Sequence, residues 1–312
     1  MIMLPKPATV PTMYFIGVTT QQSSIMKIFP KWAEALGIDA VLKGIDIPIH
    51  AREEDYRACV DFIKNDPLSL GALVTTHKID LYNAAKDIFD ECDSLALSFS
   101  ELSSISKKDG KLVAKAKDPI SSGSALNEFI PTDHWKHTNG AACVLGAGGS
   151  ALSIAWNLAK KEQGDNIPSR IFLTNRSAPR LEKATRVLSG LNVPIHYCLC
   201  PIPHLNDMIV ESLPEGSLIV NATGLGKDRP GSPLTDGCLF PKNSIIWEIN
   251  YRGTLEFMRQ AEKQKSEKDL FVEDGWAYFI YGWTQVVGDV FHIDIEGDRF
   301  DICNQIAREM GK

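Results

Sequence analysis

The chain has 312 residues, which is long for one domain and enough for two domains that each bury a core. Its hydrophobic fraction of 44% and charged fraction of 23% are ordinary for a globular protein, so the composition excludes a disordered or fibrous chain. The formal net charge of -6 provides no basic surface field, and nucleic acid is therefore not an expected partner.

Neither the apolar segments nor the cysteines indicate a membrane or an oxidising compartment. No apolar run approaches the ~18 residues of a membrane span, and the first residues lack the pattern of a signal peptide, so we expect a cytoplasmic protein without membrane contact. The 7 cysteines are odd in number and scattered, which indicates reduced thiols. Cys198 and Cys200 lie near two histidines, but their spacing matches no familiar zinc pattern, so no metal is expected.

The first part of the chain alternates strand-like and helix-like segments, a pattern typical of a parallel α/β sheet. Strands are predicted at residues 13–18, 40–45 and 71–75, and helices at residues 24–36, 52–65 and 78–88. A hairpin is predicted next, with strands at residues 103–106 and 111–115 around a turn that ends at Gly110. The polar segment 130–139 is predicted to lead into a second domain.

The second half repeats this alternation of strands and helices. Strands are predicted at residues 142–145, 170–174, 194–198, 218–221 and 245–249, with helices between them. No internal repeat or low-complexity segment interrupts the pattern. The sequence therefore predicts an α/β protein of two domains.

Three glycines join the first strand of the second half to the helix that follows it. Gly146 permits a tight turn, and Gly148 allows a phosphate to approach the backbone without meeting a Cβ atom. With Gly149 they lead into a helix whose N-terminus offers unpaired N–H groups to an anion. The pattern predicts a site for the pyrophosphate of a dinucleotide, and an ordinary glycine turn before a helix is the alternative.

A polar and basic cluster follows the second strand of this half. It contains Asn175, Arg176, Ser177 and Arg180, and no carboxylate. In dinucleotide-binding folds an acidic residue here accepts hydrogen bonds from the ribose of NAD, whereas arginine pairs with the 2′-phosphate of NADP. The cluster therefore favours NADP. The alternative is that both arginines are solvated at the start of a helix, although their charge opposes the helix dipole there.

Several motifs, in the same order and spacing, resemble those of the shikimate and quinate dehydrogenase family. They are Gly146-Ala147-Gly148-Gly149-Ser150-Ala151, Asn175-Arg176-Ser177 with Arg180, Asn221-Ala222-Thr223-Gly224-Leu225-Gly226, the segment 71–78 that ends in Thr75-Thr76-His77-Lys78, and Asp274-Gly275. The resemblance covers most of the chain. It implies a substrate-binding domain over residues 1–130, an NADP-binding Rossmann domain over 131–273, and C-terminal helices over 274–312 that return to the substrate domain, with the active site in the cleft between the domains.

The resemblance also implies which residues bind the cofactor. Thr223 and Gly224 directly follow a predicted strand whose end faces the nicotinamide in a Rossmann sheet. The full implied set is Gly146, Gly148, Gly149, Ser150, Ala151, Asn175, Arg176, Ser177, Arg180, Asn221, Ala222, Thr223, Gly224 and Gly275.

Two residues of the first domain are candidates for acid–base chemistry. Oxidation of a secondary alcohol needs a hydride acceptor, which NADP supplies, and a group that takes the hydroxyl proton. Lys78 follows a predicted strand at the edge where open α/β sheets bind ligands, and the resemblance implies that it is the catalytic lysine. Asp118 stands where the family has its acidic partner, and a carboxylate within ~4 Å favours a charged lysine. The structural alternatives are a surface lysine at a helix start and an N-cap aspartate.

The implied substrate-binding residues depart from the family pattern. Gln22, Ser23 and Ser24 stand in place of a His-Ser-x-Ser element, Leu73 replaces an asparagine before Thr75, Ser103 replaces an amide, and Tyr281 replaces a glutamine. The implied set is Gln22, Ser23, Ser24, Thr75, Ser103, Tyr251 and Tyr281; for Tyr251, packing in the core is an equal alternative. Loss of a partner for a substrate hydroxyl can change specificity by factors of ~10⁴, so a related cyclic compound is an alternative to shikimate.

We therefore expect an NADP-dependent oxidoreductase that interconverts a ring hydroxyl and a ketone in a shikimate- or quinate-like cyclic hydroxy acid, with a link to aromatic amino acid biosynthesis. Its partners would be small molecules, and it would be a monomer or homodimer. Three alternatives remain: a different substrate, a folate or amino acid enzyme of similar architecture, and a non-catalytic NADP-binding regulatory protein. The retention of Lys78 and Asp118 argues against the second. The sequence leaves the role of Glu101 open.

Overall fold

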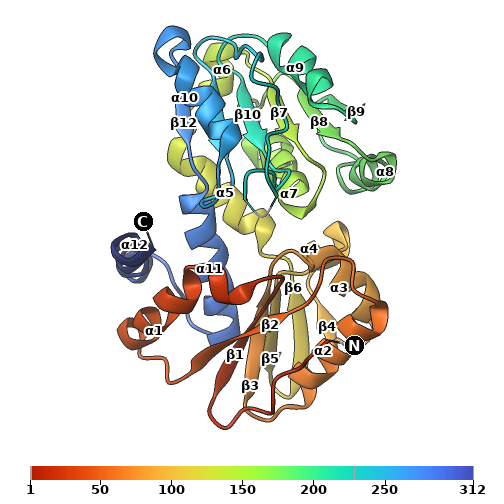
Figure 1. Cartoon of the computed structure of the whole chain (residues 1–312), viewed down its shortest axis with the longest axis vertical. Coiled ribbons are helices and arrows are strands. Elements are labelled where there is room, and N and C mark those ends of the chain that lie inside the picture. The colour runs from red at the N-terminus through yellow and green to blue at the C-terminus, as the bar shows by residue number, and fades with distance from the viewer. Residues whose placement is uncertain (1, 228, 312) are drawn as a thin grey trace. The chain divides into compact units, whose positions relative to one another are not determined.

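The computed structural model describes residues 2–227 and 229–311. The chain divides into two compact units: unit 1 comprises Met1–Asp118 and Ile280–Lys312, and unit 2 comprises Pro119–Phe279. Each unit contains a six-stranded sheet with helices on its faces, as Figure 1 shows. The protein is therefore of the α/β class, as the sequence predicts.

Unit 1 has a mixed sheet with the strand order β2-β1-β3-β5-β6-β4. The first three strands are parallel, whereas β5 runs antiparallel to both β3 and β6. The strands are β1 (Thr12–Gly17), β2 (Val41–Asp46), β3 (Ser69–Val74), β4 (Glu91–Cys92), β5 (Ser104–Lys108) and β6 (Lys111–Lys115). The predicted hairpin is thus present as β5 and β6, and it makes this part of the sheet antiparallel.

The helical segments of unit 1 are η1 (Thr20–Gln22), α1 (Ile25–Leu36), α2 (Glu53–Asn65), α3 (Lys78–Ala85), α4 (Ser94–Phe99), most of α11 (Trp276–Phe291), and α12 (Asp298–Gly311). The predicted helices of unit 1 are present: α1 and α2 begin one residue later than predicted and end as predicted, whereas α3 is shorter than predicted. Helix α3 begins at Lys78 as predicted but ends before residue 88. The short elements α4 and β4 carry too few residues to produce a periodic pattern, and the sequence does not reveal them.

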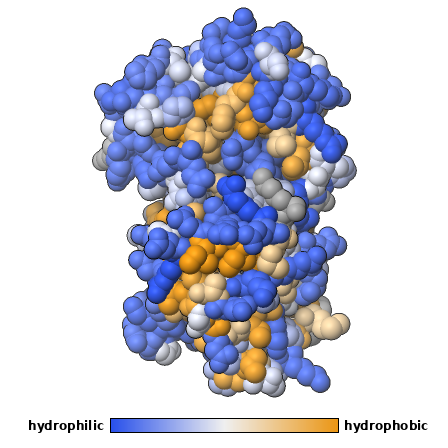
Figure 2. Space-filling view, turned by 90° about the vertical axis from the view of Figure 1, so that its left-hand side faces the viewer, coloured by the Kyte–Doolittle hydropathy of each residue, from blue (hydrophilic) through white to orange (hydrophobic). Residues whose placement is uncertain are grey.

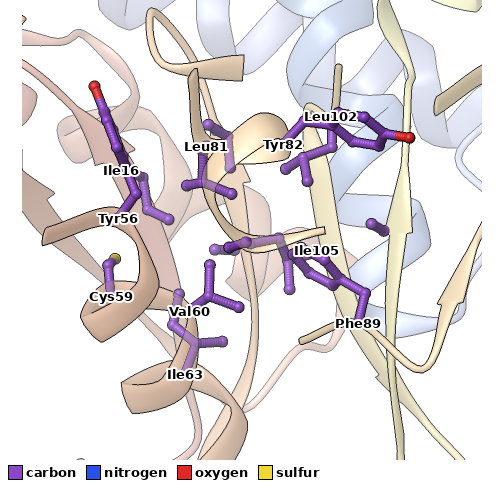
Figure 3. Close-up of a cluster of buried hydrophobic side chains, with 14 of the residues drawn as sticks. Ile16, Tyr56, Cys59, Val60, Ile63, Leu81, Tyr82, Phe89, Leu102 and Ile105 are labelled. Atoms are coloured by element: carbon purple, nitrogen blue, oxygen red, sulfur yellow. The ribbon is translucent and has the colours of Figure 1, made fainter. Parts of the chain in front are cut away.

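One core cluster of unit 1 lies between the sheet and helices α2 and α3 (Figure 3). Helix α2 contributes Tyr56, Cys59, Val60 and Ile63, whose spacing places all four on one face of a helix. Helix α3 contributes Leu81, which is fully buried. Because the buried side of α3 packs against the sheet, the first residue of α3, Lys78, is held at the end of β3.

Helix α11 packs on the opposite face of this sheet. Phe15 of β1 contacts Trp283 of α11 edge-on, with ring centroids 4.9 Å apart. The neighbouring strand residues Tyr14 and Ile16 belong to the core cluster on the other face, between the sheet and helices α2 and α3, which we call the α2 cluster. This is expected because successive side chains of a strand point to opposite faces. Helix α12 packs on α1, and the indole of Trp32 donates a hydrogen bond of 2.8 Å to the Cys303 carbonyl.

Unit 2 has a sheet in which all neighbouring strands are parallel, with the order β12-β11-β10-β7-β8-β9. The strands are β7 (Ala142–Leu145), β8 (Ile171–Asn175), β9 (Ile195–Leu199), β10 (Leu218–Asn221), β11 (Ile245–Glu248) and β12 (Phe271–Glu273). This is the 3-2-1-4-5-6 order of a Rossmann sheet, in which the direction of winding reverses between β7 and β10. Ligands of open α/β sheets bind at the carboxyl ends of the strands at such a reversal.

The helical segments of unit 2 connect these parallel strands and flank the sheet (Figure 1). They are α5 (Asp118–Phe129), α6 (His134–Thr138), α7 (Gly149–Ala159), η2 (Lys161–Gln163), α8 (Ala178–Val187), α9 (Pro203–Glu211), α10 (Glu256–Lys268) and the first turn of α11. The chain passes from unit 1 to unit 2 at the start of α5 and returns within α11. The segment 130–139 contains α6 and lies inside unit 2, where His134 Nε2 is 2.8 Å from the Gly216 carbonyl oxygen.

Hydrophilic side chains cover most of the face shown in Figure 2, and hydrophobic ones gather in separate patches. Among the exposed large hydrophobic residues are Leu199, Ile202 and Met208, on and after the edge strand β9. Within residues 2–227 and 229–311, no helix has the length and apolar character needed to cross a membrane.

Candidate functional site

Lys78 and Asp118 form an ion pair in unit 1. The backbone of Lys78 is held on both sides, because its N–H donates to the Thr75 carbonyl at 3.1 Å and its carbonyl accepts from Leu102 N–H at 3.2 Å. The side chains are 20% and 7% exposed, respectively. Since a pair withdrawn from water interacts more strongly than one on the surface, this ion pair fixes the position of the Lys78 ammonium group.

The residue before Lys78 is a buried histidine that the sequence analysis does not consider. His77 Nδ1 lies 3.1 Å from the Tyr56 hydroxyl. Burial lowers the pKa of His77 below its usual value of 6.5, although nearby backbone groups and Asp80 oppose the shift. His77 is therefore neutral at pH 7 and adds no positive charge beside Lys78.

Two of the implied substrate-binding residues lie in the strand-end segments that hold the ion pair. Ser103 precedes β5, and its Oγ accepts a hydrogen bond of 2.7 Å from the backbone N–H of Lys117, next to Asp118. Thr75 follows β3, and its methyl group would be 3.0 Å from a Cβ atom added to Gly17, at the end of β1. Thr75 and Ser103 thus share the edge of the sheet with Lys78 and Asp118.

The other implied substrate-binding residues of unit 1 have different surroundings. Gln22 is exposed, Ser23 is buried and Ser24 is half-buried where η1 passes into α1. Tyr281 of α11 stacks on Phe300 with ring centroids 4.4 Å apart, so one face of its ring is used in packing. Their contact with a substrate stays a prediction.

A second charged cluster involves strands β5 and β6 of the same sheet and helix α11, and the sequence does not predict it. Asp289 of α11 pairs with Lys115 and accepts a 2.7 Å hydrogen bond from the Ser104 hydroxyl, while Lys117 Nζ is 3.8 Å away. Burial alone would raise the pKa of Asp289, but the hydrogen bonds from Lys115 and Ser104 outweigh it, so this pKa lies below its usual value. The Glu101 side chain, whose role the sequence leaves open, is also buried.

In unit 2, the glycine turn after β7 has the geometry of an anion cradle. Gly146 has φ +117°, and a Cβ atom there would lie 2.5 Å from the Ala222 carbonyl oxygen, so only glycine fits. Gly148 is the N-cap of α7, and among the described residues no atom beyond its own and those of its two chain neighbours lies within 4 Å of its Cβ position. The open space above the first N–H groups of α7 fits a phosphate group.

The first turn of α7 is also held from outside the turn. The Tyr278 hydroxyl donates a 2.9 Å hydrogen bond to Ser150 Oγ, and Ala151 is fully buried. Gly275, near the start of α11, packs so closely on the end of β11 that an added Cβ atom would lie 2.1 Å from the Ile249 carbonyl oxygen. Gly275 is thus required for packing, and its contact with a cofactor stays a prediction.

The basic cluster after β8 lies at the start of α8. Asn175 Nδ2 donates to the Ser177 carbonyl at 3.1 Å, which shapes the turn, and Ser177 is the N-cap of the helix. Arg176 is exposed and Arg180 is half-buried. Neither arginine forms an ion pair with a carboxylate of the described residues, so both guanidinium groups can meet an anionic ligand.

The loop after β10 is tied to a buried acid, Glu248, to which the sequence analysis assigns no role. Glu248 is fully buried at the end of β11 and accepts from Asn221 Nδ2 at 2.7 Å and from the backbone and side-chain amides of Asn250 at 2.9 and 2.6 Å. Asn221 Oδ1 in turn accepts from the Thr223 N–H and hydroxyl groups. Two signals in the sequence point to Glu248: it is an acid at the end of an apolar strand, and it stands where the resembled family also has an acidic residue.

Tyr251 lies in an aromatic cluster of unit 2. Its ring centroid is 4.1 Å from that of Phe279 and 5.9 Å from that of Trp276. Lys227 Nζ is 5.9 Å from the ring centroid of Tyr251. These contacts favour the packing alternative for Tyr251, and no described contact assigns it a substrate.

The burial of Glu248 predicts a pH-dependent stability. Burial raises its pKa from 4.5 to about 7, against the opposing hydrogen bonds from Asn250 and Asn221. The folded protein therefore favours the protonated form of Glu248. The stability that this preference provides is fully present below pH 4.5 and is lost as the pH rises through 7, so the free energy of unfolding falls by at most about 3 kcal/mol. We expect urea unfolding to show that the wild type loses more stability between pH 5 and pH 8 than Glu248→Gln. Equal losses in both proteins would contradict this assignment.

Comparisons with known proteins place the chain near one group of enzymes. No family profile matches the chain. The shikimate dehydrogenase (NADP(+)) of Paramagnetospirillum magneticum is 25% identical over 237 residues, which cover 76% of this chain and 77% of that protein.

Solved structures share the fold. Shikimate 5-dehydrogenase from Thermus thermophilus, in complex with NADP(H) and shikimate, aligns with a TM-score of 0.70 and 20% identity over 96% of this chain and 99% of that chain. A 5-ketofructose reductase of Gluconobacter aligns with a TM-score of 0.68 and 16% identity, over 96% and 98% of the two chains. At these identities the structures establish the fold alone. The chain is thus similar in sequence to shikimate dehydrogenases (NADP(+)) and shares the fold of solved shikimate dehydrogenases.

Proposed function

We propose that the chain is an NADP-dependent oxidoreductase that interconverts a ring hydroxyl and a ketone in a shikimate- or quinate-like cyclic hydroxy acid. The observation that carries the proposal is the ion pair of Lys78 and Asp118 at the edge of the unit 1 sheet. The similarity of the chain to NADP-dependent shikimate dehydrogenases supports an oxidoreductase reaction on a hydroxyl group.

Unit 2 has the groups that a dinucleotide phosphate requires. The N-terminus of α7 would hold the pyrophosphate over Gly148, and Arg176 and Arg180 would pair with the 2′-phosphate of NADP. The loop that contains Thr223 and Gly224 follows β10 at the reversal of the sheet and would meet the nicotinamide. When bound, the cofactor supplies or accepts the hydride.

Unit 1 supplies the proton. In the reduction direction the Lys78 ammonium group donates a proton to the oxygen of the ketone as that carbon accepts the hydride; in oxidation, the neutral amine takes the hydroxyl proton. Asp118 holds the lysine side chain in place and stabilises its charged form. A positioned acid or base of this kind contributes about 10²- to 10⁴-fold to a rate.

Compartment, assembly and pathway complete the proposal. The seven free thiols agree with a reducing compartment such as the cytoplasm, and we propose a monomer or homodimer there. A role in aromatic amino acid biosynthesis follows if shikimate is the substrate.

A second candidate substrate is a polyhydroxy ketone without a carboxylate. The observation that favours it is the exposed Gln22 at the place of a carboxylate-binding element, together with Leu73 and Ser103 at the places of two amides. A protein of this fold named 5-ketofructose reductase shows that the fold is found with a sugar ketone as well.

A substrate screen tests the proposal. Purified protein is mixed with NADP+ or NADPH and with shikimate, quinate, their dehydro forms and 5-ketofructose, and the absorbance of NADPH is recorded. We expect turnover with at least one cyclic hydroxy acid. Turnover of 5-ketofructose alone would favour the second candidate, and no turnover with any compound would favour a non-catalytic NADP-binding protein.

Removal of either member of the ion pair should abolish most of the activity. Lys78→Ala and Asp118→Asn are each expected to lower kcat/KM for the identified substrate by about 10²-fold or more, because proton transfer loses its acid or base. Lys86→Ala is a matched control, since Lys86 is an exposed lysine at the other end of α3. Activity of either site variant within about tenfold of the wild type would refute the assigned pair.

Reversal of charge at Arg176 should reduce the preference for NADP. Arg176→Asp removes one partner of the 2′-phosphate and adds a repulsive charge, so we expect the Kd for NADPH to rise by about tenfold or more, with little change for NADH. Arg186→Asp makes the same change at the exposed C-terminal end of α8 and should affect neither cofactor. If NADH binds the wild type as tightly as NADPH, the assignment of Arg176 and Arg180 fails.

A further inference from the structure

The hydrogen bonds around Glu248 run in one direction. Thr223 donates to Asn221 Oδ1 from its N–H at 3.1 Å and from its hydroxyl at 2.7 Å. The amide group of Asn221 is thereby oriented, and its Nδ2 donates to Glu248 at 2.7 Å. From the other side, Asn250 donates twice to the second carboxylate oxygen. The network therefore ends on Glu248, where three N–H groups meet.

Above pH 7, where Glu248 is mostly ionised, its carboxylate accepts from all three donors without offering a proton to any of them. A carboxylate offers two oxygens and no proton, whereas glutamine, of the same size, must direct its NH₂ group toward one of them. Rotating the Asn221 amide to accept that NH₂ group would turn its own NH₂ group toward the N–H of Thr223. The NH₂ group of a glutamine would therefore face a buried donor of Asn221 or Asn250, which is unfavourable unless the hydrogen bonds of these residues rearrange.

The loop at the far end of this network lies against the glycine turn. The Ala222 carbonyl oxygen would be 2.5 Å from a Cβ atom on Gly146, and the Thr223 nitrogen would be 3.2 Å from it. The Thr223 hydroxyl also accepts from Leu225 N–H at 3.1 Å, and the Leu225 carbonyl accepts from both Asn221 and Asn250 at 3.2 Å. The network thus shapes the whole loop after β10, where this loop meets the turn after β7.

We propose that Glu248 is a positioning residue for NADP(H): it fixes the loop 221–226 in the conformation that receives the nicotinamide half of the cofactor. This rests on the proposed function for the identity of the cofactor. Glu248 touches no reacting group and acts through Asn221 and Thr223. An acid is required at this position because the loop presents only donors to it.

The first test is the affinity of Glu248→Gln for NADPH, measured at pH 8 by NADPH fluorescence, without substrate and well below the unfolding temperature. We expect the Kd to rise about tenfold, since one buried hydrogen bond of the network is lost. Ile246→Val is the matched control: it removes a buried methyl group from the same strand and leaves the network intact. It should lower the unfolding midpoint without changing the Kd. A Kd of Glu248→Gln within about twofold of the wild type overturns the proposal.

A second variant tests the direction of the hydrogen bonds. In Asn221→Asp combined with Glu248→Gln, the acid and the amide exchange places: the new carboxylate accepts from Thr223 and from the glutamine NH₂ group, and the glutamine oxygen accepts from Asn250. We expect this double variant to recover part of the lost affinity, because the hydrogen bond from residue 221 to the Leu225 carbonyl oxygen is still missing. A double variant that binds no better than Glu248→Gln contradicts the proposed relay. Thr223→Val changes the exposed end of the relay without disturbing the core, and should also raise the Kd.

A measurement without cofactor separates this inference from the proposed function. Hydrogen exchange at the Thr223 and Leu225 amides should be faster in Glu248→Gln than in the wild type and unchanged in Ile246→Val, because both amides donate within the network. If the wild type binds no NADPH, the proposed cofactor is wrong, and the exchange rates still decide whether Glu248 shapes the loop. Unchanged exchange at both amides would sink the inference.

Discussion

The organisation of unit 2 depends on the close approach of two turns at the carboxyl ends of neighbouring parallel strands. The turn after β7 can approach the loop after β10 only because Gly146 has no side chain, and its φ of +117° suits no other residue well. This approach joins the start of α7, with the N–H groups of its first turn, to the loop that Asn221 and Thr223 shape. A phosphate cradle and a polar loop thus become parts of one surface, at the point where the winding of the sheet reverses.

Unit 1 uses the same edge of a sheet for a different purpose. Here the strand ends carry an ion pair instead of a glycine turn, and helix α3 fixes Lys78 because its apolar face is buried in the α2 cluster. Asp118 lies at the start of α5, and Pro119 after it suits the first turn of a helix. The two sheet edges therefore carry different groups: in unit 2 the backbone N–H groups at a helix start, and in unit 1 a lysine held by a carboxylate.

Local patterns predicted much of this. The strand, turn and helix around Gly146 and the strand before Lys78 follow from apolar periodicity and glycine positions over a few residues, and the hairpin of β5 and β6 follows from its turn. The pairing of Lys115 with Asp289 could not be predicted, because the two residues are 174 positions apart and neither stands in a motif. The role of Glu248 depends on three donors from two other segments, which one acid at a strand end does not reveal. The short elements β4, β12 and α4 are fixed by pairing and packing more than by their own residues.

Unit 1 is built from two separated parts of the chain, whereas unit 2 is continuous from Pro119 to Phe279. During synthesis, the strands β1 to β6 leave the ribosome before unit 2, whereas helix α11, which packs on one face of their sheet, and helix α12, which packs on α1, leave after it. Unit 2 can therefore complete its core before unit 1 does. At that stage Phe15 has not yet packed against Trp283, and the Trp32 indole has not yet bonded to the Cys303 carbonyl. Domains usually fold in the order in which they are made. In this protein the order differs: unit 1 begins first along the chain, but its core can be completed only after unit 2 has been made.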